Sequence, residues 1–121
     1  MKAKHQLKIG VLGPHDCSRE ERALGLEVGA EIARQGAILI CGGLGGIMKA
    51  AAEGAKGNKG LTVGILPGEK SSDANEFIDV ALPTGFGPIR NALIVRESML
   101  YVPGVISLTL LVGFDASRLV T

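Results

Sequence analysis

The chain has 121 residues, of which 46% are hydrophobic, and carries 13 Lys plus Arg against 12 Asp plus Glu. This length predicts one globular domain. The net charge of +1 gives no overall positive electrostatic field of the kind that drives binding to nucleic acid or to an anionic membrane. Two cysteines do not make a disulfide framework, and no apolar signal region opens the chain, so we expect a cytoplasmic protein. The longest apolar run, residues 99–112, is shorter than the roughly 20 residues that a membrane-spanning helix needs.

The first predicted unit is a strand, a turn and a helix. Residues 7–12 form an apolar run that ends at Gly13, and Ser18 opens a capping-box pattern typical of a helix start. Apolar residues then recur at helical spacing until Gly36, which predicts the end of the helix. Two glycines one turn apart predict close packing of this helix on the sheet or on a second helix: Gly25 and Gly29.

The rest of the chain continues the alternation of strands and helices. We predict strands over residues 37–41, 61–66, 77–82 and 100–106, and helices over residues 47–55 and 89–99. Such alternation favours parallel pairing of the strands. The predicted fold class is therefore α/β, a Rossmann-like parallel sheet of about four to five strands with helices on both faces.

The most informative motif is Cys41-Gly42-Gly43-Leu44-Gly45-Gly46-Ile47-Met48, which lies between a predicted strand and a predicted helix. Glycines lack the Cβ atoms that would hold a ligand away, and the amides at a helix start attract anions. The motif therefore predicts a phosphate cradle made by Gly42, Gly43, Gly45 and Gly46 with the amides of Ile47 and Met48. Its spacing matches neither the dinucleotide fingerprint nor the P-loop, so a sharp structural turn is the alternative interpretation.

A second glycine turn, Thr84-Gly85-Phe86-Gly87-Pro88, precedes Arg90 and Asn91. Because the carboxyl ends of parallel strands share one edge of a sheet, we expect this turn to face the same ligand. Arg90 can pair with a phosphate and Asn91 can contact a sugar or base edge, with Thr84 and Gly85 framing the ligand. The alternative is that Arg90 pairs with Glu97 on a solvated helix.

A third turn, residues 13–18, belongs to the same predicted edge. We expect Gly13 to line the site and Asp16 or Ser18 to cap the helix, a position from which the Ser18 hydroxyl can also be offered to a phosphate. His15 is expected to be an exposed loop residue, and the chain has no second His/Cys cluster to complete a metal shell, so we expect no directly bound metal ion. Cys41 fits a small core residue, and Asn75 can reach over this edge.

Together these motifs resemble the Rossmann-like family of molybdenum-cofactor carrier and "lonely guy"-related proteins, often labelled lysine decarboxylase-like. The resemblance covers residues 7–97. It implies a homodimer or larger homo-oligomer that binds a phosphorylated small molecule, either the molybdenum cofactor (molybdopterin) or a nucleotide monophosphate, at the glycine-lined edge. It rests on the following residues: Gly13, Cys41 to Met48, Gly54-Ala55, Thr62 to Gly68, Ala74-Asn75, Thr84-Gly85, Gly87 and Arg90-Asn91.

The chain departs from this family after the Arg-Asn pair. The family continues into a second motif, Gly-Gly-x-Gly-Thr-x-x-Glu, which residues 98–121 do not contain. We therefore expect a single domain, residues 1–121, in which a family-like core (7–97) is followed by a divergent segment (98–121) that lacks the C-terminal part of the family fold, through a frame change or a shortened variant.

The missing motif bears on activity. Its Glu is the carboxylate that the resemblance links to hydrolysis of nucleoside 5′-monophosphates, so we expect no catalytic residues and a non-catalytic binding protein. A nucleoside 5′-monophosphate phosphoribohydrolase and an oligomerising protein without a ligand are the alternatives.

Overall fold

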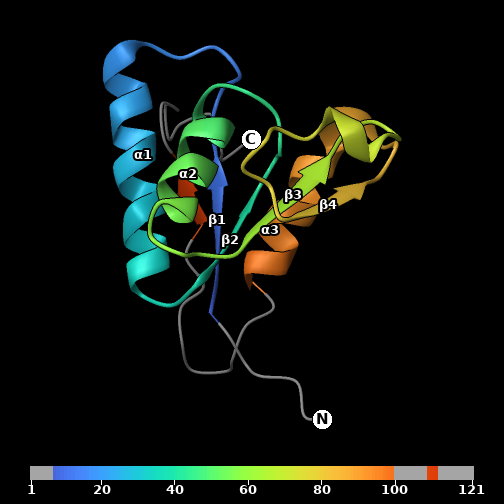
Figure 1. Cartoon of the computed structure of the whole chain (residues 1–121). Coiled ribbons are helices and arrows are strands. Elements are labelled where there is room, and N and C mark those ends of the chain that lie inside the picture. Colours follow the sequence, from blue (N-terminus) through green and yellow to red (C-terminus); the bar gives the residue numbers. More distant parts are fainter. Residues whose placement is uncertain (1–6, 100–108, 112–121) are drawn as a thin grey trace, which may run out of the picture.

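The computed structural model describes residues 7–99 and 109–111. All five strands pair in parallel in one sheet of order β4-β3-β2-β1-β5 (Figure 1). The strands are β1 (Lys8–Leu12), β2 (Ile38–Cys41), β3 (Thr62–Leu66), β4 (Val80–Pro83) and β5 (Thr109–Leu111). The helices are α1 (Arg19–Arg34), α2 (Ile47–Lys56) and α3 (Asn91–Met99), with 3₁₀ turns η1 (Ser71–Asp73) and η2 (Gly87–Arg90). The predicted Rossmann-like α/β fold is confirmed.

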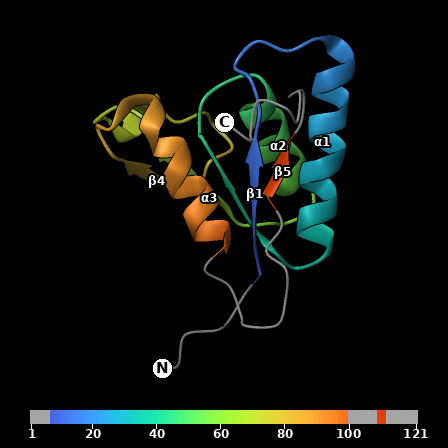
Figure 2. The same cartoon turned by 180° about the vertical axis from the view of Figure 1, so that it is seen from behind.

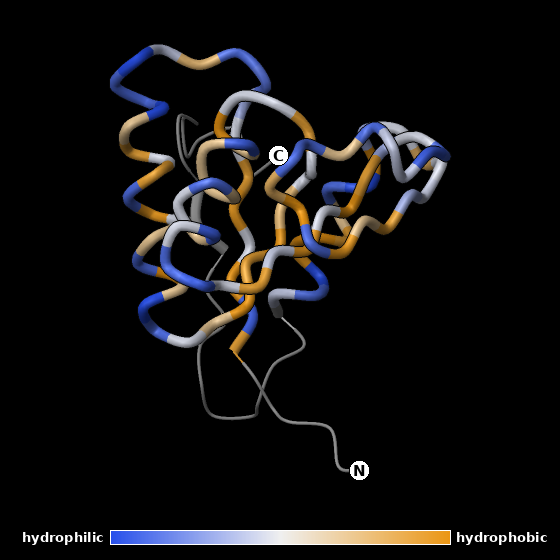
Figure 3. Tube along the Cα trace, viewed as in Figure 1, coloured by the Kyte–Doolittle hydropathy of each residue, from blue (hydrophilic) through white to orange (hydrophobic). Residues whose placement is uncertain are grey.

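Helices cover both faces of the sheet, α1 and α2 on one side and α3 on the other (Figures 1 and 2). Leu39 points to the α1 and α2 side and packs with Ile47, whereas the next residue, Ile40, packs with Ile94 of α3. This alternation follows from the two-residue period of a strand. Since both faces are covered, the central strands are mainly hydrophobic along their length (Figure 3).

The start of α1 is fixed by a capping box, as predicted. The Ser18 hydroxyl accepts from the Glu21 amide at 3.1 Å, and the Ser18 amide donates to Glu21 Oε1 at 2.9 Å. Gly36 follows the helix end with φ of 73°, a left-handed conformation that glycine adopts without strain. These local interactions set the direction in which the chain leaves β1 and returns to β2.

The close packing predicted from the glycines of α1 is confirmed, and its partner is α2. A Cβ atom on Gly29 would overlap the carbonyl group of Ala51, and one on Gly54 would overlap the carbonyl oxygen of Leu26. Glycine on both helices therefore lets their backbones touch, which places the N-terminus of α2 next to the end of β1.

Some element boundaries differ from those predicted. The segment predicted as a helix from residue 89 begins with η2 and becomes α-helical only at Asn91, and β4 begins at Val80 instead of residue 77. Just before β4, the Asp79 amide donates to the Thr62 side-chain hydroxyl of β3 at 2.8 Å. This side-chain bond precedes the regular pairing of β4 with β3. The strand predicted over residues 100–106 lies outside the described residues. No helix within the described residues is long and apolar enough to span a membrane.

Candidate functional site

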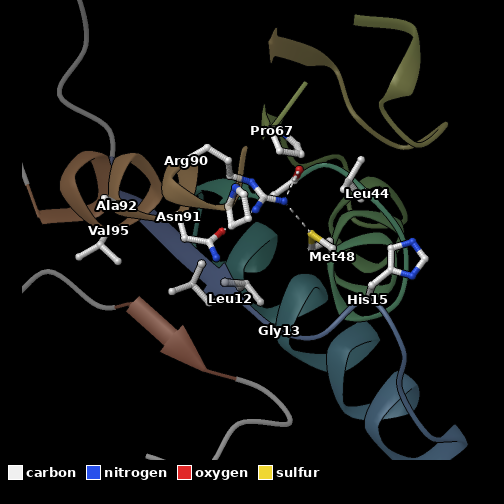
Figure 4. A pocket seen from close by; sticks show the side chains of 13 residues that line it. Leu12, Gly13, His15, Leu44, Met48, Pro67, Arg90, Asn91, Ala92 and Val95 are labelled. Carbon is white, nitrogen blue, oxygen red and sulfur yellow. Dashed lines mark hydrogen bonds between the residues drawn. The ribbon is translucent and has the colours of Figure 1, made fainter. Parts of the chain in front are cut away.

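The carboxyl ends of β1, β2 and β3 open into a cleft of about 780 Å³ (Figure 4). β1 lies where the strand order reverses, with β2 to β4 on one side and β5 on the other. Open α/β sheets commonly bind ligands in the crevice at such a point. The cleft is lined by Val11, Leu12, Gly13, His15, Gly42, Leu44, Met48, Pro67, Pro88, Arg90, Asn91, Ala92 and Val95.

Arg90 is the central polar group of the cleft wall and is only 7% exposed. Its Nε donates to the Ile65 carbonyl at 2.8 Å, while Nη2 contacts the Gly42 carbonyl at 3.3 Å and Met48 Sδ at 3.6 Å. The guanidinium group thus joins β3 to the glycine loop. These contacts occupy much of its donor fork, so a free bidentate face for phosphate, as the sequence predicted, is not present.

The charge of Arg90 has only neutral partners among the described residues. Burial lowers the pKa of its guanidinium group, because desolvation disfavours the charged form. The alternative predicted pair with Glu97 is wrong, since Glu97 Oε2 lies 3.4 Å from Lys8 Nζ. A buried cation without a counter-charge is costly, and an anion in the cleft would offset that cost.

Asn91 is held next to Arg90. Arg90 Nη1 donates to Asn91 Oδ1 at 2.8 Å, which engages the amide oxygen. The amide nitrogen has no acceptor among residues 7–98. Asn91 therefore offers donors to the cleft.

The glycine loop is shaped by close contacts with these side chains. A Cβ atom on Gly42 would overlap both Arg90 Nη2 and Met48 Sδ. Gly43, with φ of 79°, packs against β3, where a Cβ would lie 2.6 Å from Leu66 Cδ2. Glycine at position 42 thus fits the packing around Arg90, and glycine at position 43 fits the left-handed conformation and the contact with β3.

Asn75 supports the loop from outside the cleft. Its amide nitrogen donates to the Leu44 carbonyl at 2.8 Å, and its backbone amide donates to the Gly43 carbonyl at 2.9 Å. The expectation that Asn75 reaches over this edge is confirmed. These bonds hold the backbone of the glycine loop at Gly43 and Leu44.

The N-terminus of α2 has open donors, although not all those predicted. The Ile47 amide donates to the Pro14 carbonyl at 3.1 Å, so this amide is already bonded, and its predicted contact with phosphate stays a prediction. The next two amides, of Met48 and Lys49, have no acceptor within the described part of the chain, and no side chain caps this helix. Two unsatisfied N–H groups and the positive end of the helix dipole therefore lie beside the cleft.

The cleft brings together some of the predicted site residues, namely Gly13, Gly42, Met48, Arg90 and Asn91. Others lie outside its lining. Ser18 caps α1, the Thr84 hydroxyl donates to the Leu66 carbonyl at 2.8 Å, and the Gly85 amide donates to the Gly68 carbonyl at 2.8 Å. The turn at Thr84 and Gly85 thus closes the end of β3 and does not frame the cleft. Gly43, Gly45 and Gly46 also lie outside the lining and shape the loop.

Several lining residues were not predicted. His15 is exposed, as expected, but its ring lies over the loop, where a Cβ on Gly45 would be 2.9 Å from His15 Nε2. Pro67 directly follows β3, and that position at a strand end is the signal that could have found it. The cleft also has an apolar wall formed by Leu12, Ala92 and Val95. The sequence does not indicate that these residues line a cleft, because apolar residues in strands and helices usually belong to the core.

Residues 7–99 and 109–111 contain no group of three His, Cys, Asp or Glu residues placed to hold a metal ion. Cys41 is fully buried, and burial raises the pKa of its thiol to about 11. Its Sγ lies 3.8 Å from the Met48 carbonyl oxygen. These properties fit the core role expected for Cys41.

Solved structures similar to this one include two molybdenum-cofactor proteins. The molybdenum cofactor binding protein of Rippkaea orientalis is 30% identical with a TM-score of 0.82, over 93% of this chain and 66% of that protein. The Moco carrier protein of Chlamydomonas reinhardtii is 30% identical with a TM-score of 0.76, over 92% of this chain and 64% of that protein.

A sequence relative from Archaeoglobus fulgidus, an uncharacterised protein, is 45% identical over 92 residues. This match spans 76% of the present chain and 60% of the relative. The chain thus spans less than two thirds of the length of each of these proteins. The model of the SLOG cluster4 family matches residues 6–111, and the chain belongs to that family.

Proposed function

We propose that the chain binds a phosphorylated small molecule of the molybdenum-cofactor type in the cleft and does not convert it. The observation that carries the proposal is the buried guanidinium group of Arg90, which has neutral protein partners and faces the cleft. A bound phosphate would supply the missing negative charge in a site of low dielectric, where such attraction is strong.

The phosphate would lie between Arg90 and the N-terminus of α2. There the amides of Met48 and Lys49 provide open donors, and the glycine at position 42 leaves room for the Arg90 guanidinium group beside them. Arg90 would act mainly through its charge, because most of its N–H groups are already bonded to the protein.

The size and the neighbours of the cleft agree with this proposal. A volume of about 780 Å³ lies in the range of roughly 300–1,000 Å³ typical of small-molecule sites. The similar structures from Rippkaea orientalis and Chlamydomonas reinhardtii are described as binding or carrying the molybdenum cofactor. A pterin with a phosphate group would place its charge at α2 and its ring against the apolar wall.

The test is calorimetric titration of the whole chain with molybdopterin, AMP and adenosine. We expect both phosphorylated ligands to bind at least tenfold more tightly than adenosine, and Arg90→Met to abolish that difference. Arg96→Met is the matched control, because Arg96 is exposed on α3, the helix that directly follows Arg90, and does not line the cleft. Equal affinity for AMP and adenosine in the unmodified chain would contradict the proposal.

Binding without turnover is the second part of the proposal. The described lining residues include no Asp or Glu, the groups that normally act as acid or base in glycosidic cleavage. Incubation with AMP should therefore release no adenine above the background rate. Adenine release that is lost in Arg90→Met would favour the phosphoribohydrolase alternative.

We also propose self-association, through the open edge of β4. Four of the exposed large apolar side chains lie on this edge and the turn after it: Val80, Leu82, Phe86 and Ile89. An edge strand with apolar side chains favours pairing with a second copy. Light scattering should show a homo-oligomer that Leu82→Lys dissociates, and a monomer at high concentration would contradict this proposal.

A further inference from the structure

We infer that Asn91 is a specificity-determining residue whose Nδ2 group presents hydrogen-bond donors to the cleft, so the cleft selects a phosphorylated heterocycle with an acceptor atom facing that group. The inference rests on the proposed function, since it concerns the same cleft. It adds the orientation of the ligand and the chemistry of its uncharged part.

The amide of Asn91 is held in one orientation by Arg90. Guanidinium nitrogen atoms only donate, so the atom of Asn91 that lies 2.8 Å from Arg90 Nη1 must be the amide oxygen. Turning the amide over would place two donors against each other. The Nδ2 group therefore points away from Arg90, toward the side of the cleft where Leu12 lies (Figure 4).

The surroundings of Asn91 differ from those of the α2 N-terminus. Leu12, Ala92 and Val95 form an apolar wall on the same side of the cleft as Asn91, whereas Met48 and Leu44 lie on the other side of Arg90 (Figure 4). The cleft is thus divided into an end with open backbone amides and an end that is apolar except for Asn91. A ligand with its phosphate at α2 would lay its ring along this apolar end.

The chemistry of the ring follows from this division. The Nδ2 donors need an acceptor once a ligand has displaced water, and a ring carbonyl or an unprotonated ring nitrogen supplies one. A ligand that placed an amino group next to Asn91 Nδ2 would bring two hydrogen-bond donors together, and neither would have an acceptor on this apolar side of the cleft. Purine and pterin phosphates that turn a ring carbonyl or an unprotonated ring nitrogen toward Asn91 satisfy both ends of the cleft.

The test compares GMP, guanosine and inorganic phosphate on three forms of the whole chain. In Asn91→Leu, which keeps the side-chain size but removes the donors, we expect GMP to bind roughly tenfold more weakly and inorganic phosphate to change by less than twofold. In Asn91→Asp the new carboxylate would pair with Arg90 and cancel its charge, so both ligands should weaken by at least tenfold.

The outcomes separate this inference from the proposed function. If the unmodified chain binds GMP no better than guanosine, the proposed function fails and the inference fails with it. If phosphate-dependent binding is present but Asn91→Leu leaves the affinity for GMP unchanged, only the inference is overturned. An equal loss of GMP and phosphate binding in Asn91→Leu would also overturn it, because Asn91 would then act at the phosphate. Asn91 is exposed, so Asn91→Leu should keep a cooperative thermal transition, whereas Asn91→Asp, whose carboxylate would pair with Arg90, should not lower the melting temperature.

Discussion

The α1–α2 interface and the loop after β2 are both rich in glycine, yet glycine serves a different purpose in each. At the interface, Gly29 and Gly54 let two helix backbones touch, and each would overlap a carbonyl group if it carried a Cβ. In the loop, Gly42 makes room for the side chains of Arg90 and Met48. The first use of glycine stabilises the fold, and the second shapes the cleft, so substitutions in the two regions should have different effects.

The largest effect is expected at the helix interface. Gly29→Ala places a methyl group into the Ala51 carbonyl, and separating two packed backbones should lower the free energy of unfolding by about 3 kcal/mol. Gly57→Ala is the control, because the φ of −63° at Gly57 suits alanine and the added Cβ would lie 3.5 Å from the Glu53 carbonyl oxygen, an ordinary van der Waals distance. Urea denaturation measures both. A change below about 0.5 kcal/mol in Gly29→Ala would show that the helices can separate freely.

Gly42→Ala should change binding more than stability. The added Cβ would displace Arg90 Nη2 and Met48 Sδ, which are side-chain atoms that can move, so the expected loss of stability is about 1–2 kcal/mol. Displacing the guanidinium group should weaken phosphate-dependent binding at least tenfold in titration with AMP. Unchanged affinity for AMP would mean that the position of Arg90 does not matter to the ligand.

Asn75→Ala tests the support of the loop from outside the cleft. Losing the bond to the Leu44 carbonyl should cost about 1 kcal/mol of stability and weaken AMP binding several-fold, because the loop becomes less ordered. Asn58→Ala is a matched control, since the side-chain nitrogen of Asn58 donates to the Gly54 carbonyl at 3.0 Å, at the end of α2 that is far from the cleft. It should lose similar stability and keep its affinity. Equal effects of both variants on binding would contradict a specific role of Asn75.

The smallest effect concerns the acid stability of the fold. Burial alone would raise the pKa of Asp79, but hydrogen bonds from Lys56 Nζ at 3.0 Å and the Thr62 amide at 2.9 Å outweigh it and lower that pKa. The resulting stabilisation is complete above the ordinary carboxyl pKa and disappears as the pH falls through the lowered value.

Asp79→Asn should therefore lower stability by about 1 kcal/mol at neutral pH and by less in acid. Thermal unfolding at several pH values measures this difference. If the stability difference between Asp79→Asn and the unmodified chain is the same in acid as at neutral pH, the stabilising role of an ionised Asp79 is contradicted.

The sequence predicted the fold well because its signals are local. The Ser18 capping box, the strand-ending glycines and the alternation of elements each depend on neighbouring residues. The site was predicted less well, because its geometry depends on distant contacts. The Arg-Asn pair was recognised, but its partners, the Ile65 and Gly42 carbonyl groups, lie far away along the chain. Likewise, nothing local to Ile47 indicates that Pro14 accepts from its amide.

The central claim is that an anion binds at open backbone amides beside Arg90. The most direct test follows the backbone amide resonances of the ¹⁵N-labelled chain during titration with inorganic phosphate. The account predicts saturable shifts at Met48 and Lys49 that are absent in Arg90→Met, with little change at Ile47, whose amide is already bonded. If the Met48 and Lys49 resonances stay in place up to saturating phosphate, the claim is contradicted.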